Sequence, residues 1–322
     1  MRCPACHRGG REEAEAGLRH VPMPTRYGRS ARELVRITAA WPRGAAARPS
    51  FIAQLHARWA AGTLLCVGLD PEVERLPATI RGGTAAAALL SFNAAIVEAT
   101  ADLVCAYKPN AAFYEAHGPA GADALVRTIA LIHERAPNVP VLLDAKRGDM
   151  ANTSRLYARA AFDVCAADAV TVQPYLGAQA LAPFLERADR GVFVLCRTSD
   201  PGAGELQDLR SDGEPLYLHV ARQVADLWNA RGNCGLVVGA TWPEELRAIR
   251  AAAPTLPILL PGIGAQGGDL EACVRAGLDA QGQGLLVSAS RSVLYASPGA
   301  DFGQAARREA LRLRDAINQQ HA

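Results

Sequence analysis

Lysine occurs at only two positions of this chain, Lys108 and Lys146, whereas arginine occurs 32 times. An arginine keeps its proton in a protein, but a lysine ammonium is compact and its pKa moves with its surroundings. Both lysines end apolar runs, and Lys146 stands between Asp144 and Asp149 in the segment D-A-K-R-G-D. A bias towards arginine codons explains the missing lysines but not the placement of these two. The pattern predicts a site that uses a titratable cation.

Spacing brings these charges together if the runs are β-strands. Asp144 and Lys146 are two residues apart and therefore share one face of a strand. Lys108 and Asp70 hold equivalent inward positions at the ends of two preceding runs. Asp149 lies beyond the strand end, too far along to fold back beside its own Lys146. A structural network of ion pairs is the alternative, but buried charges are weak evidence for stability, and we favour function.

Two further segments carry polar groups after apolar runs. The first is P-G-I-G-A-Q-G-G (261–268), in which the backbone N–H groups of Gly262 and Gly264 can approach an oxyanion closely, followed later by Ser290 and Arg291. An arginine fork binds phosphate in a bidentate manner, so this pair of segments predicts a phosphate site. The second is R-T-S-D-P-G-A (197–203), which is either a plain turn or a binder of a planar polar base through Ser199.

The elements that must position these residues alternate between short β-rich runs and alanine-rich helical stretches. Expected strands span 63–70, 103–110, 140–146, 169–175, 191–198, 234–240, 257–263 and 284–290. Expected helices span 84–100, 118–136, 151–164, 177–187, 215–231, 243–252, 267–277 and 302–318. Eight such units predict an α/β fold, a closed (β/α)8 TIM barrel with its active site at the carboxyl ends of the strands. A doubly wound sheet is the alternative, but no G-x-G-x-x-G follows the first strand.

Composition limits the remaining classes. The net charge of +2 gives no sign of a nucleic-acid binder, and no apolar stretch is long enough for a membrane span or a secretory signal. Residues 1–48 hold ten arginines and no lysine, and they read as a disordered extension or a start assigned too early. Their C-P-A-C-H (3–7) has haem-attachment or half-zinc-site spacing, but we expect neither function. Scattered cysteines without a secretory signal indicate reduced thiols in a cytoplasmic protein. Residues 49–322 then form the barrel domain.

Five motifs together resemble the orotidine 5′-phosphate decarboxylase family. They are G-L-D-P (68–71), Y-K-P-N-x-A-F-Y-E (107–115), D-A-K-R-G-D (144–149), R-T-S-D-P-G-A (197–203) and P-G-I-G-A-Q-G-G-D (261–269). The longer K-P-N-x-A-F form is similar to one subgroup, type 2. The resemblance runs from Phe51 to Ile317. D-x-K-x-x-D alone is shared with other barrels, but its combination with Lys108 and the glycine-rich loop is highly specific.

The resemblance implies a cofactor-free, metal-free decarboxylation of orotidine 5′-phosphate to UMP and CO2, with Lys146 protonating C6 of the pyrimidine. It also implies a homodimer with shared active sites. By this resemblance Asp144 faces the substrate carboxylate, Ser199 contacts the pyrimidine edge, and Asp70 and Lys108 hold the ribose with Asn110 beside them. The phosphate is bound by Gln266 and Arg291 together with Gly262, Gly264 and Ser290. Asp149 and Thr153 enter the partner's site. Two departures are Asp200, where Asn is common, and Ser290, where many members have Gly.

Two other functions stay open at this point. One is a magnesium-dependent sugar-phosphate lyase or decarboxylase of the same superfamily, which shares D-x-K-x-x-D but needs a carboxylate metal ligand where Lys108 stands. The other is a non-catalytic nucleotide-binding barrel, which would not need Lys146.

Overall fold

The computed structural model describes residues 48–262 and 270–321, and they contain eight parallel strands joined in one sheet. The strands coincide with the eight expected apolar runs; seven are trimmed at one or both ends, and β3 begins two residues late and ends one residue beyond its expected range. They are β1 (Leu65–Leu69), β2 (Ala106–Pro109), β3 (Leu142–Arg147), β4 (Ala169–Val172), β5 (Gly191–Arg197), β8 (Cys234–Val238), β9 (Ile258–Pro261) and β10 (Leu285–Ala289).

The sheet closes on itself. Its strand order is β2-β1-β10-β9-β8-β5-β4-β3, and the two ends of this series meet through parallel bridges between Tyr107 and Val141 and between Asn110 and Asp144. Nearly every strand residue is buried, as expected for a parallel sheet covered on both faces. The expected (β/α)8 barrel is therefore confirmed.

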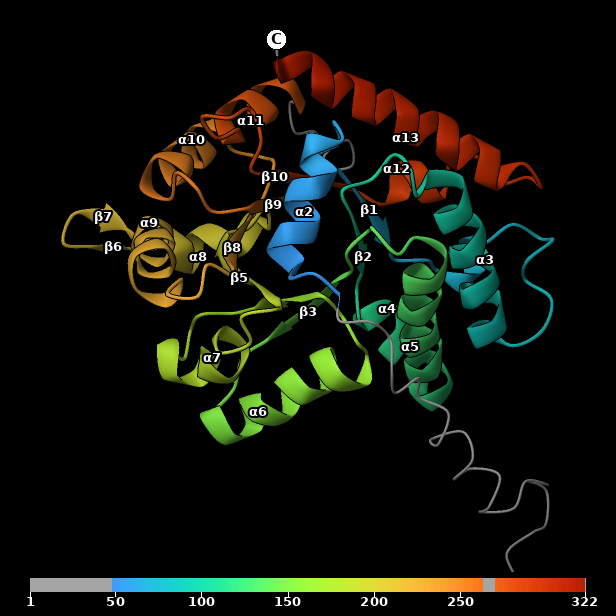
Figure 1. The fold of residues 1–322 in the computed structure, drawn as a ribbon, viewed down its shortest axis with the longest axis horizontal. Coiled ribbons are helices and arrows are strands. Elements are labelled where there is room, and N and C mark those ends of the chain that lie inside the picture. Colours follow the sequence, from blue (N-terminus) through green and yellow to red (C-terminus); the bar gives the residue numbers. More distant parts are fainter. Residues whose placement is uncertain (1–47, 263–269, 322) are drawn as a thin grey trace, which may run out of the picture. The chain divides into compact units, whose positions relative to one another are not determined.

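Helices follow the strands and surround them (Figure 1). The bounds of the eight expected helices are α3 (Ala85–Thr100), α5 (Gly118–Arg135), α6 (Ala151–Arg159), α7 (Ala178–Leu185), α9 (Leu216–Arg222), α10 (Pro243–Ala252), α11 (Leu270–Gly277) and α13 (Phe302–Asn318). Two of them, α6 and α9, end five or more residues before their predicted ends, because they continue as π-helical turns, Ala160–Val164 and Gln223–Trp228. The apolar spacing continues through these turns, so sequence periodicity does not mark the change.

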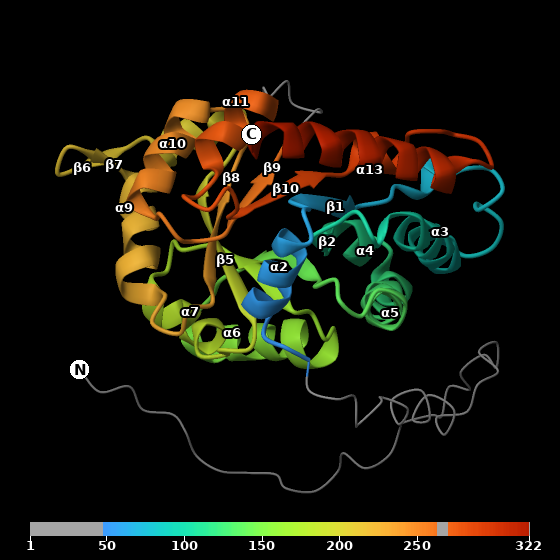
Figure 2. The same cartoon turned by 45° about the horizontal axis from the view of Figure 1, so that its top comes forward.

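One helix that the sequence analysis did not predict, α2 (Phe51–Ala60), lies across the middle of the ring of strands (Figures 1 and 2). Ser50 caps it by accepting a hydrogen bond from the Ala53 N–H. The Phe51 ring packs edge-on against Phe193, and the indole N–H of Trp59 donates to the carbonyl of Leu285 at the start of β10. Helix α2 therefore covers the amino end of the barrel and leaves the carboxyl end for the polar residues.

Short elements decorate the loops after the strands. They are α4 (Ala112–Glu115), α8 (Gly204–Gln207), the hairpin β6 (Arg210–Ser211) and β7 (Glu214–Pro215), and α12 (Arg291–Leu294); the 3-10 turns are Val73–Arg75, Pro201–Ala203 and Gln319–His321. Segments of two to four residues are too short to show a period, so the sequence gives no signal for them.

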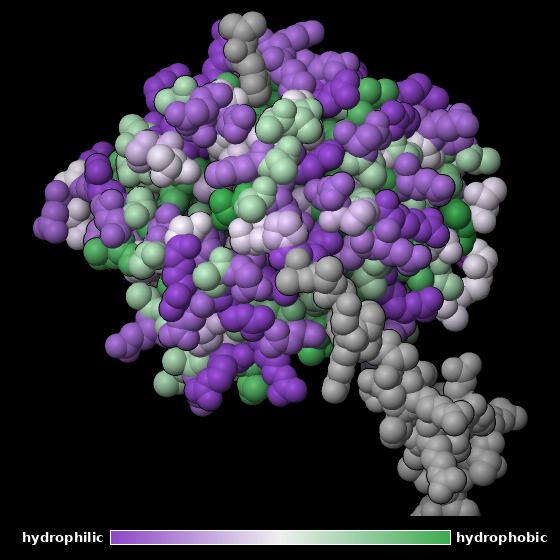
Figure 3. Space-filling model, in the orientation of Figure 1, coloured by the Kyte–Doolittle hydropathy of each residue, from purple (hydrophilic) through white to green (hydrophobic). Residues whose placement is uncertain are grey.

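The face seen in Figure 3 is largely hydrophilic, with apolar residues in small scattered groups. Within the described ranges, no helix is long and apolar enough to cross a membrane. The expected extension and its C-x-x-C-H lie outside the described residues.

Candidate active site

The Asp144 carboxylate is the centre of a charge network at the carboxyl ends of β2, β3 and β4. Its Oδ1 accepts hydrogen bonds from Lys146 Nζ at 2.7 Å and Thr171 Oγ1 at 2.9 Å. Its Oδ2 accepts from Lys108 Nζ at 3.1 Å and Asn110 Nδ2 at 3.2 Å. Burial by itself would raise the pKa of Asp144, but the two lysines outweigh it and hold that pKa well below its usual range. The carboxylate stays ionised.

Lys108 is the fixed cation of this network. Its ammonium lies between Asp144 and Asp70, whose Oδ2 is 3.7 Å away, and its side chain is 6% exposed. Burial favours the neutral amine, yet the attraction of Asp70 and Asp144 prevails and raises the pKa of Lys108. Asp70 is held in turn by the backbone N–H of Asn110, which donates to its Oδ1 at 3.0 Å. Burial raises the pKa of Cys66, on β1, to about 12, so its thiol adds no charge to the network.

Lys146 reaches the network from an irregular part of β3. The pairing of β3 with β4 shifts between Leu143 and Arg147, and Lys146 has a φ of 46°, a left-handed conformation that is uncommon for a residue with a side chain. Its side chain is 47% exposed, in contrast to Lys108. The expected meeting of Asp144 and Lys146 is confirmed, but a bulge produces it rather than the simple alternation of a flat strand.

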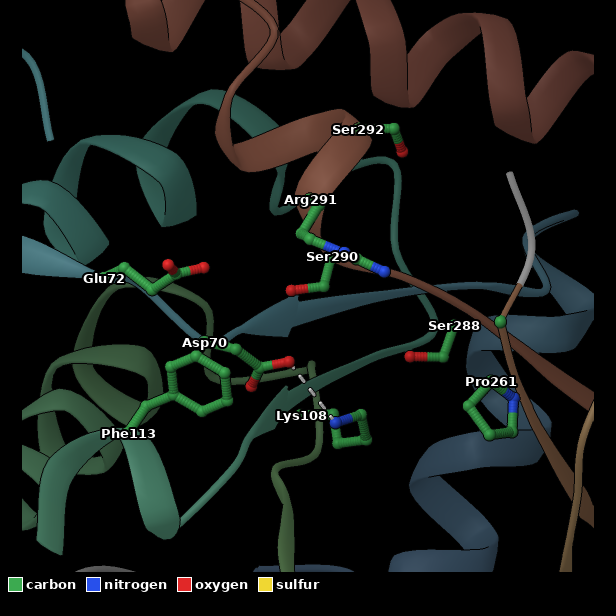
Figure 4. A pocket seen from close by; sticks show the side chains of 10 residues that line it. Asp70, Glu72, Lys108, Phe113, Pro261, Ser288, Ser290, Arg291 and Ser292 are labelled. Atoms are coloured by element: carbon green, nitrogen blue, oxygen red, sulfur yellow. Dashed lines mark ion pairs between the residues drawn. The ribbon is translucent and has the colours of Figure 1, made fainter. Parts of the chain in front are cut away.

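A cavity of about 190 Å³ adjoins the network and shares Asp70 and Lys108 with it (Figure 4). The remaining lining residues come mainly from the loops after β1, β9 and β10: Glu72, Phe113, Pro261, Gly262, Ser288, Ser290, Arg291 and Ser292. Arg291 begins α12 and Ser290 directly precedes it, so both stand where the sequence analysis predicts a phosphate site.

Two glycines shape this end of the cavity. Gly262 has a φ of 101°, a conformation that glycine adopts without strain. Gly68 on β1 lies so close to Ser290 that a Cβ at position 68 would come within 2.8 Å of the Ser290 Cβ. The glycine of G-L-D-P is therefore needed for Ser290, directly after β10, to approach β1.

Other predicted site residues have different placements. Gly264 and Gln266 lie outside the described residues. Thr153 on α6 and Ser199 after β5 are half-buried, and neither is among the residues that line the cavity. Asp149 is also half-buried, and its Oδ1 accepts from the backbone N–H of Met150. Within the described ranges, no ion pair joins Asp149 to either lysine.

Sequence reasoning missed five residues of this site. Thr171 has a usable signal, because it is the single polar residue of the buried run A-V-T-V on β4. Ser288 has a similar one in L-L-V-S-A on β10. Phe113 belongs to the motif K-P-N-x-A-F but received no role, whereas Glu72 and Ser292 are placed by local geometry after β1 and β10, for which the sequence shows no pattern.

The arrangement combines two chemical capacities. A negatively charged group can be held at Arg291, and a second negative charge that develops near Lys146 would meet an ammonium that can also donate a proton. The shared residues Asp70 and Lys108 place both capacities within one molecule's reach.

Comparisons with known proteins agree with this geometry. Residues 63–307 match the model of the orotidine 5'-phosphate decarboxylase / HUMPS family. Orotidine 5'-phosphate decarboxylase of Roseiflexus castenholzii is 56% identical over 263 residues, which cover 81% of this chain and 94% of that protein. The decarboxylase of Ralstonia pickettii is 52% identical, covering 84% and 98%. The solved OMP decarboxylase of Leishmania donovani has a TM-score of 0.72 at 42% identity, covering 84% of this chain and 99% of that one. The chain belongs to the orotidine 5'-phosphate decarboxylase / HUMPS family.

Proposed function

We propose that this protein decarboxylates orotidine 5′-phosphate to UMP and CO2, the step that completes UMP in pyrimidine biosynthesis. The observation that carries the proposal is the continuity of the site. The network around Asp144 and the cavity that leads to Arg291 share Asp70 and Lys108. A nucleotide with its phosphate at Arg291 can therefore extend its ribose past Asp70 and Lys108 towards Lys146.

The charges of the network suit this reaction. Loss of CO2 from C6 leaves a carbanion in the plane of the ring, with no carbonyl placed to delocalise it. Fixed groups must stabilise that charge, and the Lys146 ammonium does so before it transfers its proton to C6. Asp144 faces the departing carboxylate in this arrangement. Binding energy from the remote phosphate orients the ring and contributes to the rate at C6.

The position of Lys108 argues against the magnesium-dependent alternative. Its ammonium lies between Asp70 and Asp144, the two carboxylates that a divalent cation would use. A metal ion there would be repelled by Lys108 and by Lys146, which is 2.7 Å from Asp144. This argument supports a reaction without a metal or cofactor.

Ultraviolet absorbance tests the activity directly. The absorbance of orotidine 5′-phosphate should change to that of UMP in the presence of the protein and EDTA, at a rate proportional to protein concentration. Turnover that EDTA abolishes and Mg²⁺ restores would favour the metal-dependent alternative. Binding of the nucleotide without turnover would favour the non-catalytic barrel.

A homodimer with shared active sites is the second part of the proposal. Asp149 and Thr153 follow β3 and lie near Met150 and Leu156, apolar side chains that are 69% and 64% exposed. Exposed apolar residues beside an otherwise polar loop suit a subunit contact. Each site would then combine Lys146 of one chain with Asp149 of the other.

Subunit exchange tests the sharing. Inactive Lys146→Ala and Asp149→Ala proteins are mixed under conditions that exchange subunits. In a hybrid dimer one site carries both lesions and the other carries neither. Random exchange makes about half of the dimers hybrid, so about a quarter of the wild-type sites should return in an isologous dimer. If Asp149 acts within its own chain, activity stays absent after verified exchange.

Residues 49–322 form the decarboxylase domain in this proposal, and residues 1–48 are an extension that catalysis does not need. A protein that begins at Pro49 should keep the turnover and melting temperature of the full chain, and a large loss of either would contradict the division. A cytoplasmic location fits the six free cysteines of the described ranges. The type 2 subgroup rests on the K-P-N-x-A-F motif.

A further inference from the structure

Thr171 on β4 is fully buried and lies opposite the irregular part of β3. Leu143 pairs with Val170 and Arg147 pairs with Val172, so four steps along β3 match two along β4. The N–H groups inside this bulge lose their regular place in the ladder. The Thr171 hydroxyl takes the place of the missing ladder acceptors, because its Oγ1 accepts hydrogen bonds from the N–H of Ala145 at 3.0 Å and from the N–H of Lys146 at 2.9 Å.

The same hydroxyl also orients the carboxylate. Its single hydrogen is donated to Asp144 Oδ1 at 2.9 Å, the oxygen that Lys146 Nζ contacts at 2.7 Å. One donor and two acceptor positions are thereby all used. A single side chain fixes the left-handed backbone of Lys146 and the carboxylate towards which that lysine points.

We propose that Thr171 is a positioning residue for proton transfer by Lys146, an inference that rests on the proposed function. During the reaction the proton leaves Lys146 Nζ for C6, and a neutral amine remains. Asp144 then loses its nearest cation and depends on Thr171, Lys108 and Asn110 to stay ionised and in place. Thr171 touches neither the substrate nor the reacting carbon in this scheme and acts through Lys146 and Asp144.

The test compares variants that keep the shape of the side chain with variants that keep its hydroxyl. Thr171→Val removes the hydroxyl at nearly constant volume, and Thr171→Ser keeps it. Thr128→Val is the matched control, since Thr128 is another fully buried threonine, on α5, whose hydroxyl accepts a hydrogen bond from Asn93. We expect kcat of Thr171→Val to fall about 100-fold, the scale of a small misplacement of a reacting group. KM should change little, and the serine variant and the control should stay near the wild type.

A second measurement separates positioning from loss of structure. Proton NMR of UMP in deuterium oxide reports exchange of the C6 hydrogen, which requires proton transfer at Lys146 but no decarboxylation. Thr171→Val should slow this exchange as much as it slows kcat, while bound UMP still raises the melting temperature.

Several results would overturn the proposal. A Thr171→Val protein with the kcat and exchange rate of the wild type would refute it, and so would an equal loss in the serine variant. If the valine variant does not fold, Thr171→Cys takes its place, because a thiol is a weaker donor and acceptor; equal rates for the serine and cysteine variants would then refute the role of the hydroxyl. A wild-type protein without decarboxylase activity would refute the proposed function and this inference together, whereas an active wild type matched by Thr171→Val refutes only the inference.

Discussion

Replacing Asp144 by asparagine tests the charge network most directly. The wild-type carboxylate receives four donors, two on each oxygen. An asparagine amide has one oxygen and one NH2 group. If the amide oxygen faces Lys146 and Thr171, its NH2 group faces Lys108 and Asn110, which are donors themselves. The substitution also leaves two ammonium groups with Asp70 as the remaining carboxylate.

The expected cost follows from the burial of Lys108. Removing one partner of a buried ion pair costs about 3–5 kcal/mol, and Asp70, 3.7 Å from Lys108, compensates part of it. We therefore expect Asp144→Asn to lower the free energy of unfolding by about 3 kcal/mol near neutral pH. For a barrel of this size that corresponds to a fall in melting temperature of about 6–9 °C.

The dependence on pH has a defined sign. The folded-state pKa of Asp144 lies below its value in the unfolded chain. Its ionised form therefore stabilises the fold above an unfolded-state pKa of about 3.9, and that contribution is lost as the pH falls towards the lower folded value. The difference in melting temperature between the wild type and Asp144→Asn should begin to narrow as the pH falls below about 4, and it should keep narrowing towards the lower folded-state value.

Circular dichroism melts of three proteins decide the matter. The matched control is Asp102→Asn, which breaks a pair with Arg307 on the surface and should cost less than about 1 kcal/mol. A melting temperature of Asp144→Asn equal to that of this control at pH 7 would refute the view that Asp144 compensates the buried ammonium. An unchanged gap at acid pH would contradict the assigned pKa direction.

Three further predictions concern single arginines and the proton donor. Lys146→Arg should lose at least about 100-fold in turnover, because arginine does not readily donate a proton, while calorimetry should still detect UMP binding; near-normal turnover would remove Lys146 from that role. Arg291→Ala should lower kcat/KM about 100-fold for orotidine 5′-phosphate but much less for orotidine without phosphate, and equal losses would place the phosphate elsewhere. Arg250→Met should lower the free energy of unfolding by about 2–4 kcal/mol without changing kcat at 25 °C. The reason is that the Arg250 guanidinium donates hydrogen bonds to four backbone carbonyls, those of Gly277, Ala253, Leu256 and Gly284. An unchanged free energy of unfolding or a fall in kcat would contradict this.

The barrel could be predicted from the sequence because its signal is repeated eight times. Most strands are apolar along their length, as in V-F-V-L-C on β5, and each strand is followed by a helix. In the structure Thr84 caps α3 by accepting a hydrogen bond from the Ala87 N–H. Helix α2 gave no such repeat, since it precedes the first strand and belongs to no βα unit. Its place follows from tertiary contacts such as the one between Phe51 and Phe193.

The candidate site, like the fold, could be predicted from the sequence only in part. The lysines and aspartates could be found because charged residues are rare at the ends of apolar runs. The way they meet could not, because a bulge leaves no mark in the sequence D-A-K-R. The left-handed Lys146 and the hydroxyl that supports it depend on the register between β3 and β4. The positions of Glu72, after β1, and of Phe113, on the short helix α4, depend on how these segments fold over the cavity.

The two lysines of the chain differ in burial in a way that suits two tasks. Lys108 is 6% exposed and lies between two carboxylates, so it is held in place as a fixed positive charge. Lys146 is 47% exposed, and within the described ranges it pairs with one carboxylate, Asp144, so its side chain is less constrained than that of Lys108. Two ammonium groups and two carboxylates leave the cluster neutral, which limits the cost of burying it. In the proposed reaction the transfer of a proton from Lys146 to C6 would leave the cluster negative by one charge, with Lys108 as the cation that balances it. Under this proposal an arginine would serve at neither place, because position 108 needs a compact charge and position 146 a transferable proton.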